Sequence, residues 1–115
     1  MTIQVKRVYD PPAGKDGYRI LVDRIWPRGL SKEQAKVDLW LKEIAPSTAL
    51  RRWFGHDPDK WHEFQRRYFR ELERLPDQVD QLKKLVRRKR VTLLYAAKNT
   101  DCNNAAALKS FLGSH

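Results

Sequence analysis

The sequence YRILVD at residues 18–23 decides the fold, because its unbroken Ile-Leu-Val run is typical of a strand buried on both faces. Strands of this kind occur in parallel sheets that are covered by helices. A second run, VTLLYAA at residues 91–97, predicts another such strand, and the period-2 alternation of residues 3–8 predicts a third. We therefore expect an α/β fold with a sheet of about three strands, at least two of them, 18–23 and 91–97, parallel.

Helices are expected between and after these strands. Ser31 followed by Gln34 forms a capping-box pattern, and apolar residues at spacings of three and four then predict an amphipathic helix. The expected four to five helices cover residues 32–45, 48–54, 58–75, 77–89 and the segment after residue 103. The order strand, strand, helices, strand, helix belongs to a small α/β sandwich, with the central helices forming the crossover between parallel strands. We expect one domain over residues 1–115.

The composition excludes several classes of protein. The chain has 115 residues with 41% apolar side chains, which is enough to form a core. A chain of this length buries roughly 65% of its unfolded surface on folding, so general disorder is excluded. No apolar run reaches the ~18 residues that a membrane span needs, and residues 1–6 do not resemble a secretory signal. The single cysteine excludes an internal disulfide. We expect a cytoplasmic protein with no membrane partner and no cofactor.

The positive charge is concentrated in one segment. The net charge is +10, and residues 83–90 hold six basic and no acidic residues, so the rest of the chain sums to +4. Helical spacing places the cations of this segment opposite its apolar residues. A solvated helix end that favours cations is the simplest interpretation, and a protein-docking surface is another. A nucleic-acid-binding surface is the third, carried by Lys83, Lys84, Arg87, Arg88 and Arg90.

Polar residues follow the two parallel strands at the point where each ends. In an open α/β sheet, ligands bind beyond the carboxyl ends of the strands, and a helix that begins there favours an anion. The predicted site is a small-molecule site for a phosphate or carboxylate, with Asp23 as an orienting residue or a base. Its ligand-binding residues are predicted to be Arg24, Trp26, Arg28, Lys98, Asn99, Asn103 and Asn104. Both an enzyme and a binding protein fit this pattern.

Each of these residues also has a structural interpretation. Asp23 can pair with a neighbouring cation, Trp26 before Pro27 can be a packing wedge, and the two asparagines can cap the last helix.

Two further clusters are weaker candidates. His56 and His62 with nearby carboxylates match no standard metal spacing, so no metal site is predicted. Cys102 precedes a helix N-terminus near a lysine, which favours a reactive thiol, but no histidine lies near it in sequence to act as a base.

The chain resembles the YeaO-like family of bacterial proteins. The resemblance rests on residues 17–29, which contain Asp-Arg-Ile-Trp-Pro-Arg-Gly, and on residues 6–10, 42–47 and 93–99. It implies a small cytoplasmic α/β domain and no particular reaction. Some members carry a transcriptional-regulator label, but no winged helix-turn-helix pattern is present here.

One position departs from the pattern of the family. Its members tend to have Asn-His-Ala where this chain has Asn103-Asn104-Ala105. A histidine there would be a proton carrier, whereas an asparagine forms hydrogen bonds without titrating near neutrality. The departure argues against acid–base chemistry at this position and leaves binding open.

Overall fold

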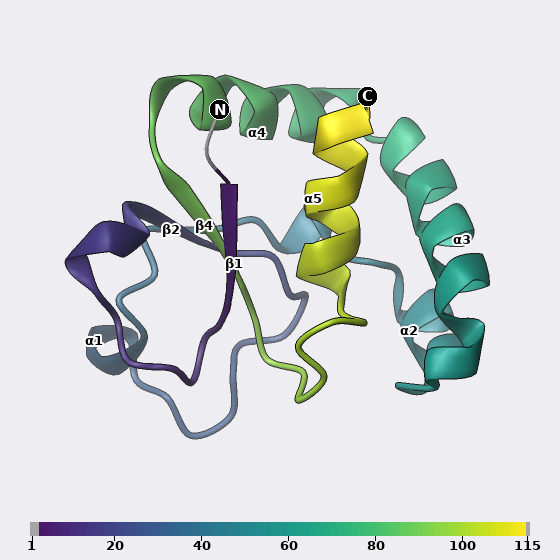
Figure 1. Ribbon diagram of the computed structural model, residues 1–115, viewed down its shortest axis with the longest axis horizontal. Coiled ribbons are helices and arrows are strands. Elements are labelled where there is room, and N and C mark those ends of the chain that lie inside the picture. Colours follow the sequence, from purple (N-terminus) through teal and green to yellow (C-terminus); the bar gives the residue numbers. More distant parts are fainter. Residues whose placement is uncertain (1–2, 115) are drawn as a thin grey trace.

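The computed structural model describes residues 3–114 as one parallel sheet with helices packed around it (Figure 1). The strands are β1 (Ile3–Arg7), β2 (Tyr18–Leu21), β3 (Leu39–Trp40) and β4 (Val91–Tyr95). The helices are α1 (Lys32–Ala35), α2 (Thr48–Phe54), α3 (Trp61–Glu73), α4 (Pro76–Arg88) and α5 (Asn104–Ser114). Short 3-10 turns cover Gly14–Asp16, Lys42–Ile44 and Pro58–Lys60. The predicted α/β class, the parallel pair and the five helices are confirmed, with one strand more than expected.

The sheet has the order β1-β4-β2-β3, and every neighbouring pair is parallel. Leu93 at the centre of β4 lies opposite Val5 on one side and Ile20 on the other. All five residues of β4 are buried. Because each pair is parallel, the carboxyl ends of all the strands meet at one edge of the sheet.

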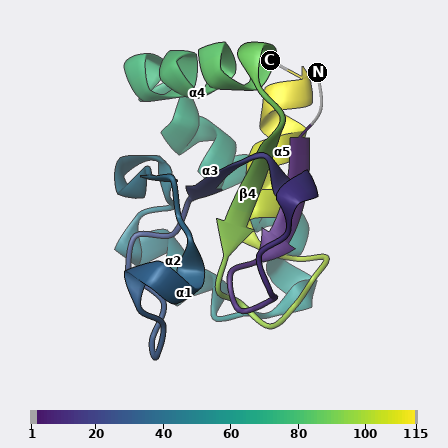
Figure 2. The same ribbon diagram turned by 90° about the vertical axis from the view of Figure 1, so that its left-hand side faces the viewer.

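Helices α2 to α5 cover one face of the sheet. Residues of β4 alternate between the faces, with Leu93 in the main core and Leu94 in a smaller cluster on the other face. The smaller cluster also holds Ala35 of α1, and Trp26 and Trp40 pack against it. Helix α4 lies across the end of the sheet where β4 begins, and α5 begins at the opposite end (Figure 2).

The expected helix over residues 32–45 is wrong beyond its first turn. Ser31 and Gln34 form the predicted capping box, but the helix ends at Lys36, whose backbone is left-handed at φ 46°. The residues that follow pair with the sheet instead. The Asp38 N–H donates to the Arg19 carbonyl at 2.8 Å, and the Asp38 carboxylate accepts from the Arg19 N–H. Leu39 and Trp40 thereby form β3. The spacing of the apolar residues was real, but they divide between the two faces of the sheet.

A buried polar cluster holds α1 against β2. The Arg19 guanidinium forms an ion pair with Asp16 and donates to the carbonyls of Ala35 and Lys36. Asp16 also accepts from Lys6 and from the Ala13 N–H. Both members of the Arg19–Asp16 pair are almost fully buried, so losing either partner would leave an uncompensated buried charge.

Gly17 is required where the chain enters β2. Its φ is +68°, and a side-chain carbon at this position would collide with the Arg90 carbonyl. That carbonyl accepts the Tyr18 N–H at 2.8 Å, which starts the pairing of β2 with β4.

We expect Gly17→Ala to destabilise the fold by about 2 kcal/mol or more, because the variant combines a strained φ with a backbone collision. Urea denaturation followed by circular dichroism measures this. Gly113→Ala is the matched control: Gly113 lies in α5 with open space around it, so the change should be neutral or stabilising by roughly 0.5–1 kcal/mol. Equal changes in the free energy of unfolding for the two variants would contradict the requirement for glycine at position 17.

The stability of the fold should fall in acid because of Asp16. Burial by itself raises the pKa of Asp16, but the Ala13 N–H and the Lys6 and Arg19 cations bring it below the usual value of 3.8. A lowered folded-state pKa contributes stability above the unfolded-state value and loses it as the pH falls through the folded-state value. The free energy of unfolding, measured by urea titration from about pH 6 down to about pH 2, should decrease below about pH 4.

Asp16→Asn should flatten that part of the profile. Asp80→Asn should not, because the Asp80–Lys84 pair is exposed on both sides. A profile as steep in Asp16→Asn as in the native chain would contradict the role of Asp16.

Candidate functional site

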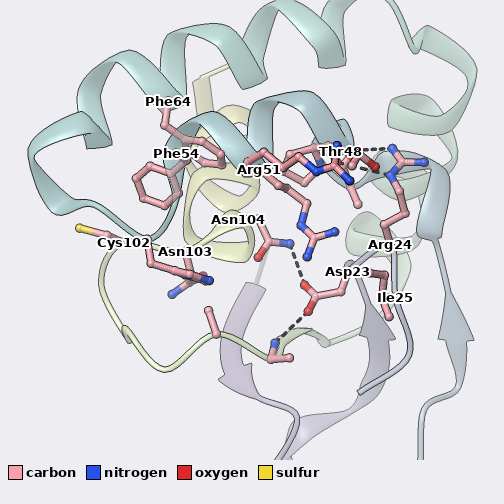
Figure 3. Close-up of a pocket in the computed structure, with 16 residues that line it drawn as sticks. Asp23, Arg24, Ile25, Thr48, Arg51, Phe54, Phe64, Cys102, Asn103 and Asn104 are labelled. Atoms are coloured by element: carbon pink, nitrogen blue, oxygen red, sulfur yellow. Dashed lines mark hydrogen bonds between the residues drawn. The ribbon is translucent and has the colours of Figure 1, made fainter. Parts of the chain in front are cut away.

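A cavity of about 500 Å³ opens at the edge where the strands end (Figure 3). We call it the edge cavity. The ends of β2 and β4, helix α2 and the beginning of α5 supply most of its lining. Its position follows from the parallel sheet, whose carboxyl ends all face this side.

Half of the predicted ligand-site residues line the edge cavity. Asp23, Arg24, Asn103 and Asn104 are in its lining. Trp26, Arg28, Lys98 and Asn99 are not. The residues that line the cavity together come from the end of β2 and the start of α5. These two segments are far apart in sequence: Asp23 and Asn104, which are hydrogen-bonded, are separated by 81 positions.

Asp23 ties three elements together at the floor of the cavity. Its Oδ2 accepts the Ala96 N–H at 3.0 Å, and its Oδ1 accepts from the Asn104 side chain at 2.9 Å. The same Asn104 amide donates to the Val22 carbonyl. Figure 3 shows Asp23 held between these two donors. The end of β2, the end of β4 and the first turn of α5 are therefore linked through one carboxyl group.

Burial raises the pKa of Asp23 above its usual value. The hydrogen bonds from Asn104 and Ala96 and the charge of Arg51 act in the opposite direction without cancelling the effect of burial. Since both carboxyl oxygens already accept N–H groups of the protein, the geometry favours a positioning role for Asp23.

Three arginines line the edge cavity. Arg24 donates to the carbonyls of Ala45 and Pro46, at 3.0 and 3.4 Å, and so is partly used in holding the segment before α2. Arg51 and Arg52 are exposed, and neither forms a salt bridge within residues 3–114. Their guanidinium groups are available to an anion in the cavity.

Helix α2 is fixed in place at its first residue. The Ser47 hydroxyl accepts the Leu50 N–H as an N-cap and donates to the Glu71 carboxylate at 2.6 Å. The Ser47 N–H donates to the other oxygen of Glu71. This clamp between α2 and α3 sets the position of Arg51 and Arg52 relative to the strand ends.

Arg51 and Arg52 are absent from the predicted site, although the helix that carries them is predicted. The only signal in the sequence is a pair of adjacent arginines in a short helix after Pro46. That pair says nothing about which part of the sheet α2 contacts, and the contact places the arginines in the site.

Asn103 and Asn99 build the loop before α5. The Asn103 side chain accepts the Ala106 N–H and donates to the Asn99 carbonyl, so it caps the helix as the structural interpretation predicts. The Asn99 side chain accepts the N–H groups of Asp101 and Cys102. Of these two asparagines only Asn103 reaches the lining of the cavity.

The other predicted residues lie away from the cavity. Trp26 donates to the Leu30 carbonyl at 2.7 Å and meets the Trp40 ring edge-on, so it is the packing wedge of the second face. Arg28 and Lys98 are exposed. The main-chain carbonyl of Arg28 accepts the Tyr9 hydroxyl.

His56 and Cys102 also line the edge cavity. Within residues 3–114, no group of three or more His, Cys, Asp or Glu side chains is placed to hold a metal ion. None of the helices in that same range has the length and apolar character needed to cross a membrane.

The basic segment lies at the other end of the sheet. Arg87 and Arg88 on α4 are exposed, and the neighbouring cations have partners inside the protein. Lys84 pairs with Asp80 at 3.2 Å. The Lys89 ammonium lies 4.4 Å from the centre of the Tyr18 ring, and Arg90 donates to the Lys15 carbonyl. Lys83 lies on the same helix and is half-buried.

Comparison with known proteins places the chain in a family. A family model described as "Inactive DUF488-N3 subclade" matches residues 2–115. The "Uncharacterized protein YeaO" of Escherichia coli K12 is 46% identical over 114 residues, which cover 99% of each chain. The "Uncharacterized protein Rv3073c" of Mycobacterium tuberculosis is 40% identical over 110 residues, covering 96% of this chain and 92% of the relative. No solved structure matches. The predicted resemblance is confirmed, and the chain belongs to the YeaO-like family, whose matching model describes the inactive DUF488-N3 subclade.

Proposed function

We propose that this protein binds a small organic or inorganic anion in the edge cavity and does not transform it. The observation that carries the proposal is the set of three arginines around one cavity at the carboxyl ends of parallel strands. Arg51 and Arg52 form no salt bridge among residues 3–114, so a bound carboxylate or phosphate would pair with them directly.

The geometry of the floor favours binding over catalysis. A general base needs an oxygen or nitrogen free to accept a proton from the substrate. Each oxygen of Asp23 already accepts one N–H of the protein, which fixes the carboxyl in a structural role, and the adjacent Asn104 does not titrate near neutral pH. The matching family model is described as inactive, which agrees with a binding role.

A thermal-shift screen tests the proposal. We expect at least one of inorganic phosphate, acetate and benzoate to raise the melting temperature at millimolar concentration, since a ligand that binds the folded state stabilises it by about 2.7 kcal/mol at 100 times its Kd. The double variant Arg51→Gln, Arg52→Gln should lose this stabilisation. Arg87→Gln, on α4, is the matched control and should keep it. A flat screen, or a shift of equal size in the double variant, would refute the proposal.

Nucleic-acid binding by the basic segment 83–90 is the second candidate. It rests on the exposed Arg87 and Arg88 of α4, next to Lys89 and Arg90; α4 lies at the opposite end of the sheet from the start of α5 (Figure 1). Two features weaken it: Lys84 is paired with Asp80, and no aromatic side chain of α4 itself is available for stacking on bases.

This candidate predicts binding to a labelled DNA duplex at about 50 mM salt, with a log–log salt slope of roughly −0.9 per phosphate neutralised. Fluorescence anisotropy measures it. Charge reversal at Lys84 and Arg88 should abolish DNA binding and leave the anion response of the edge cavity unchanged, because the two surfaces are at opposite ends of the sheet. No binding at low salt, or binding that salt does not weaken, would eliminate this candidate.

A further inference from the structure

We infer that the ligand of the edge cavity is an organic monoanion with a flat apolar body, such as an aromatic carboxylate. This inference rests on the function proposed above and names the chemical class of its ligand. It comes from the way the lining divides: Arg24 and Arg51 lie on one side of the cavity, and the rings of Phe54 and Phe64 lie on the other (Figure 3).

The cationic side is suited to one anionic group. Arg51 and Arg52 project from α2 and are exposed, whereas Arg24 is partly occupied by the Ala45 and Pro46 carbonyls. A guanidinium group can bind both oxygens of a carboxylate. The floor beside these arginines carries the Asp23 carboxyl, whose oxygens accept N–H groups of the protein and offer no donor to a second anionic group placed deeper in the cavity. The charge pattern therefore favours a monoanion whose charged end stays near α2.

The apolar side is a rigid aromatic wall. Phe54 and Phe64 line the cavity, and their rings are stacked with centroids 4.4 Å apart; Trp61, which is outside the lining, supports Phe64 from 5.7 Å. Phe54 and Phe64 belong to the main core, so they are already ordered before a ligand arrives. Ala97 at the end of β4 continues this side. A flat ring can lie along such a wall without ordering the protein further.

Ile25 adds an exposed apolar side chain on the side of the cavity where Arg24 lies (Figure 3). It is 62% exposed, an unusual degree for a large hydrophobic side chain of residues 3–114, and it lines the cavity. A ligand with an apolar body would cover part of this side chain, which an inorganic anion would leave in water.

The volume of the cavity points the same way. About 500 Å³ lies within the range of roughly 300–1,000 Å³ that is usual for sites of ring-sized organic ligands. One water occupies about 30 Å³, so phosphate or acetate would leave most of the cavity filled with solvent. An aromatic acid is large enough to touch the arginines and the phenylalanines together.

Isothermal titration calorimetry with four probes tests the inference. Benzoate carries the ring and the charge, acetate and inorganic phosphate carry the charge alone, and benzamide carries the ring alone. We expect benzoate to bind at least about tenfold more tightly than each of the other three, since a tenfold ratio corresponds to about 1.4 kcal/mol and partial burial of a ring supplies that much.

Two variants separate the halves of the cavity. Ala97→Leu narrows the apolar side and should weaken benzoate about tenfold while leaving acetate and phosphate unchanged. Arg51→Gln should weaken all three anions. Ala49→Leu is the matched control, because Ala49 lies on α2, is exposed and is outside the lining. Ala49→Leu should leave the affinities for benzoate, acetate and phosphate unchanged.

The outcomes distinguish this inference from the proposal on which it rests. Equal affinities for benzoate, acetate and phosphate would overturn the inference and leave anion binding intact. An Ala97→Leu variant that binds benzoate as the native chain does would also overturn it. If benzamide binds as tightly as benzoate, the charge adds nothing to the affinity for the ring and the inference is overturned. If none of the anions binds, anion binding itself fails and the inference fails with it.

Discussion

The burial of β4 between two parallel partners is the constraint on which the rest of the structure depends. A strand with all five residues buried needs hydrogen-bonding neighbours on both edges and apolar cover on both faces. Parallel pairing with β1 and β2 supplies the hydrogen-bonding neighbours. Parallel pairing also forces every connection to cross over the sheet, and the helices in these connections supply the apolar cover. The same pairing collects the carboxyl ends of the strands at one edge, where the edge cavity lies.

Polar groups appear inside this structure where they connect elements that apolar packing alone would leave free to shift. Asp16 and Arg19 attach α1 to β2 on one face of the sheet. Asp23 and Asn104 attach α5 to the ends of β2 and β4 at the edge. A buried carboxyl group is costly unless its oxygens are satisfied, and in both places N–H donors of the protein satisfy them. At the edge, this arrangement leaves the floor of the cavity ordered.

The distribution of charge separates two surfaces that the net charge of +10 does not distinguish. The cations of the basic segment 83–90 lie at the end of the sheet where the strands begin, and Lys84, Lys89 and Arg90 have partners within the protein. The arginines of the edge cavity lie at the opposite end, and Arg51 and Arg52 form no salt bridge among residues 3–114. The total number of basic residues is therefore less informative about a binding partner than the positions of the few cations that line the edge cavity.

By itself the sequence determined the local elements, which are the buried strands 18–21 and 91–95 and the caps at Ser31 and Ser47. It also determined that two strand ends meet near Asp23 and Asn104. Propensity, capping and the rule for parallel strands act over short ranges, so the sequence alone is enough to apply them. Only the tertiary structure decided that residues 37–40 leave the helix to form β3, since a hydrogen bond to Arg19 outweighs an apolar spacing that suits a helix equally well. It also decided that Arg51 and Arg52, not Arg28 and Lys98, line the edge cavity. That choice depends on the clamp between Ser47 and Glu71, a contact between residues 24 positions apart that no local pattern encodes.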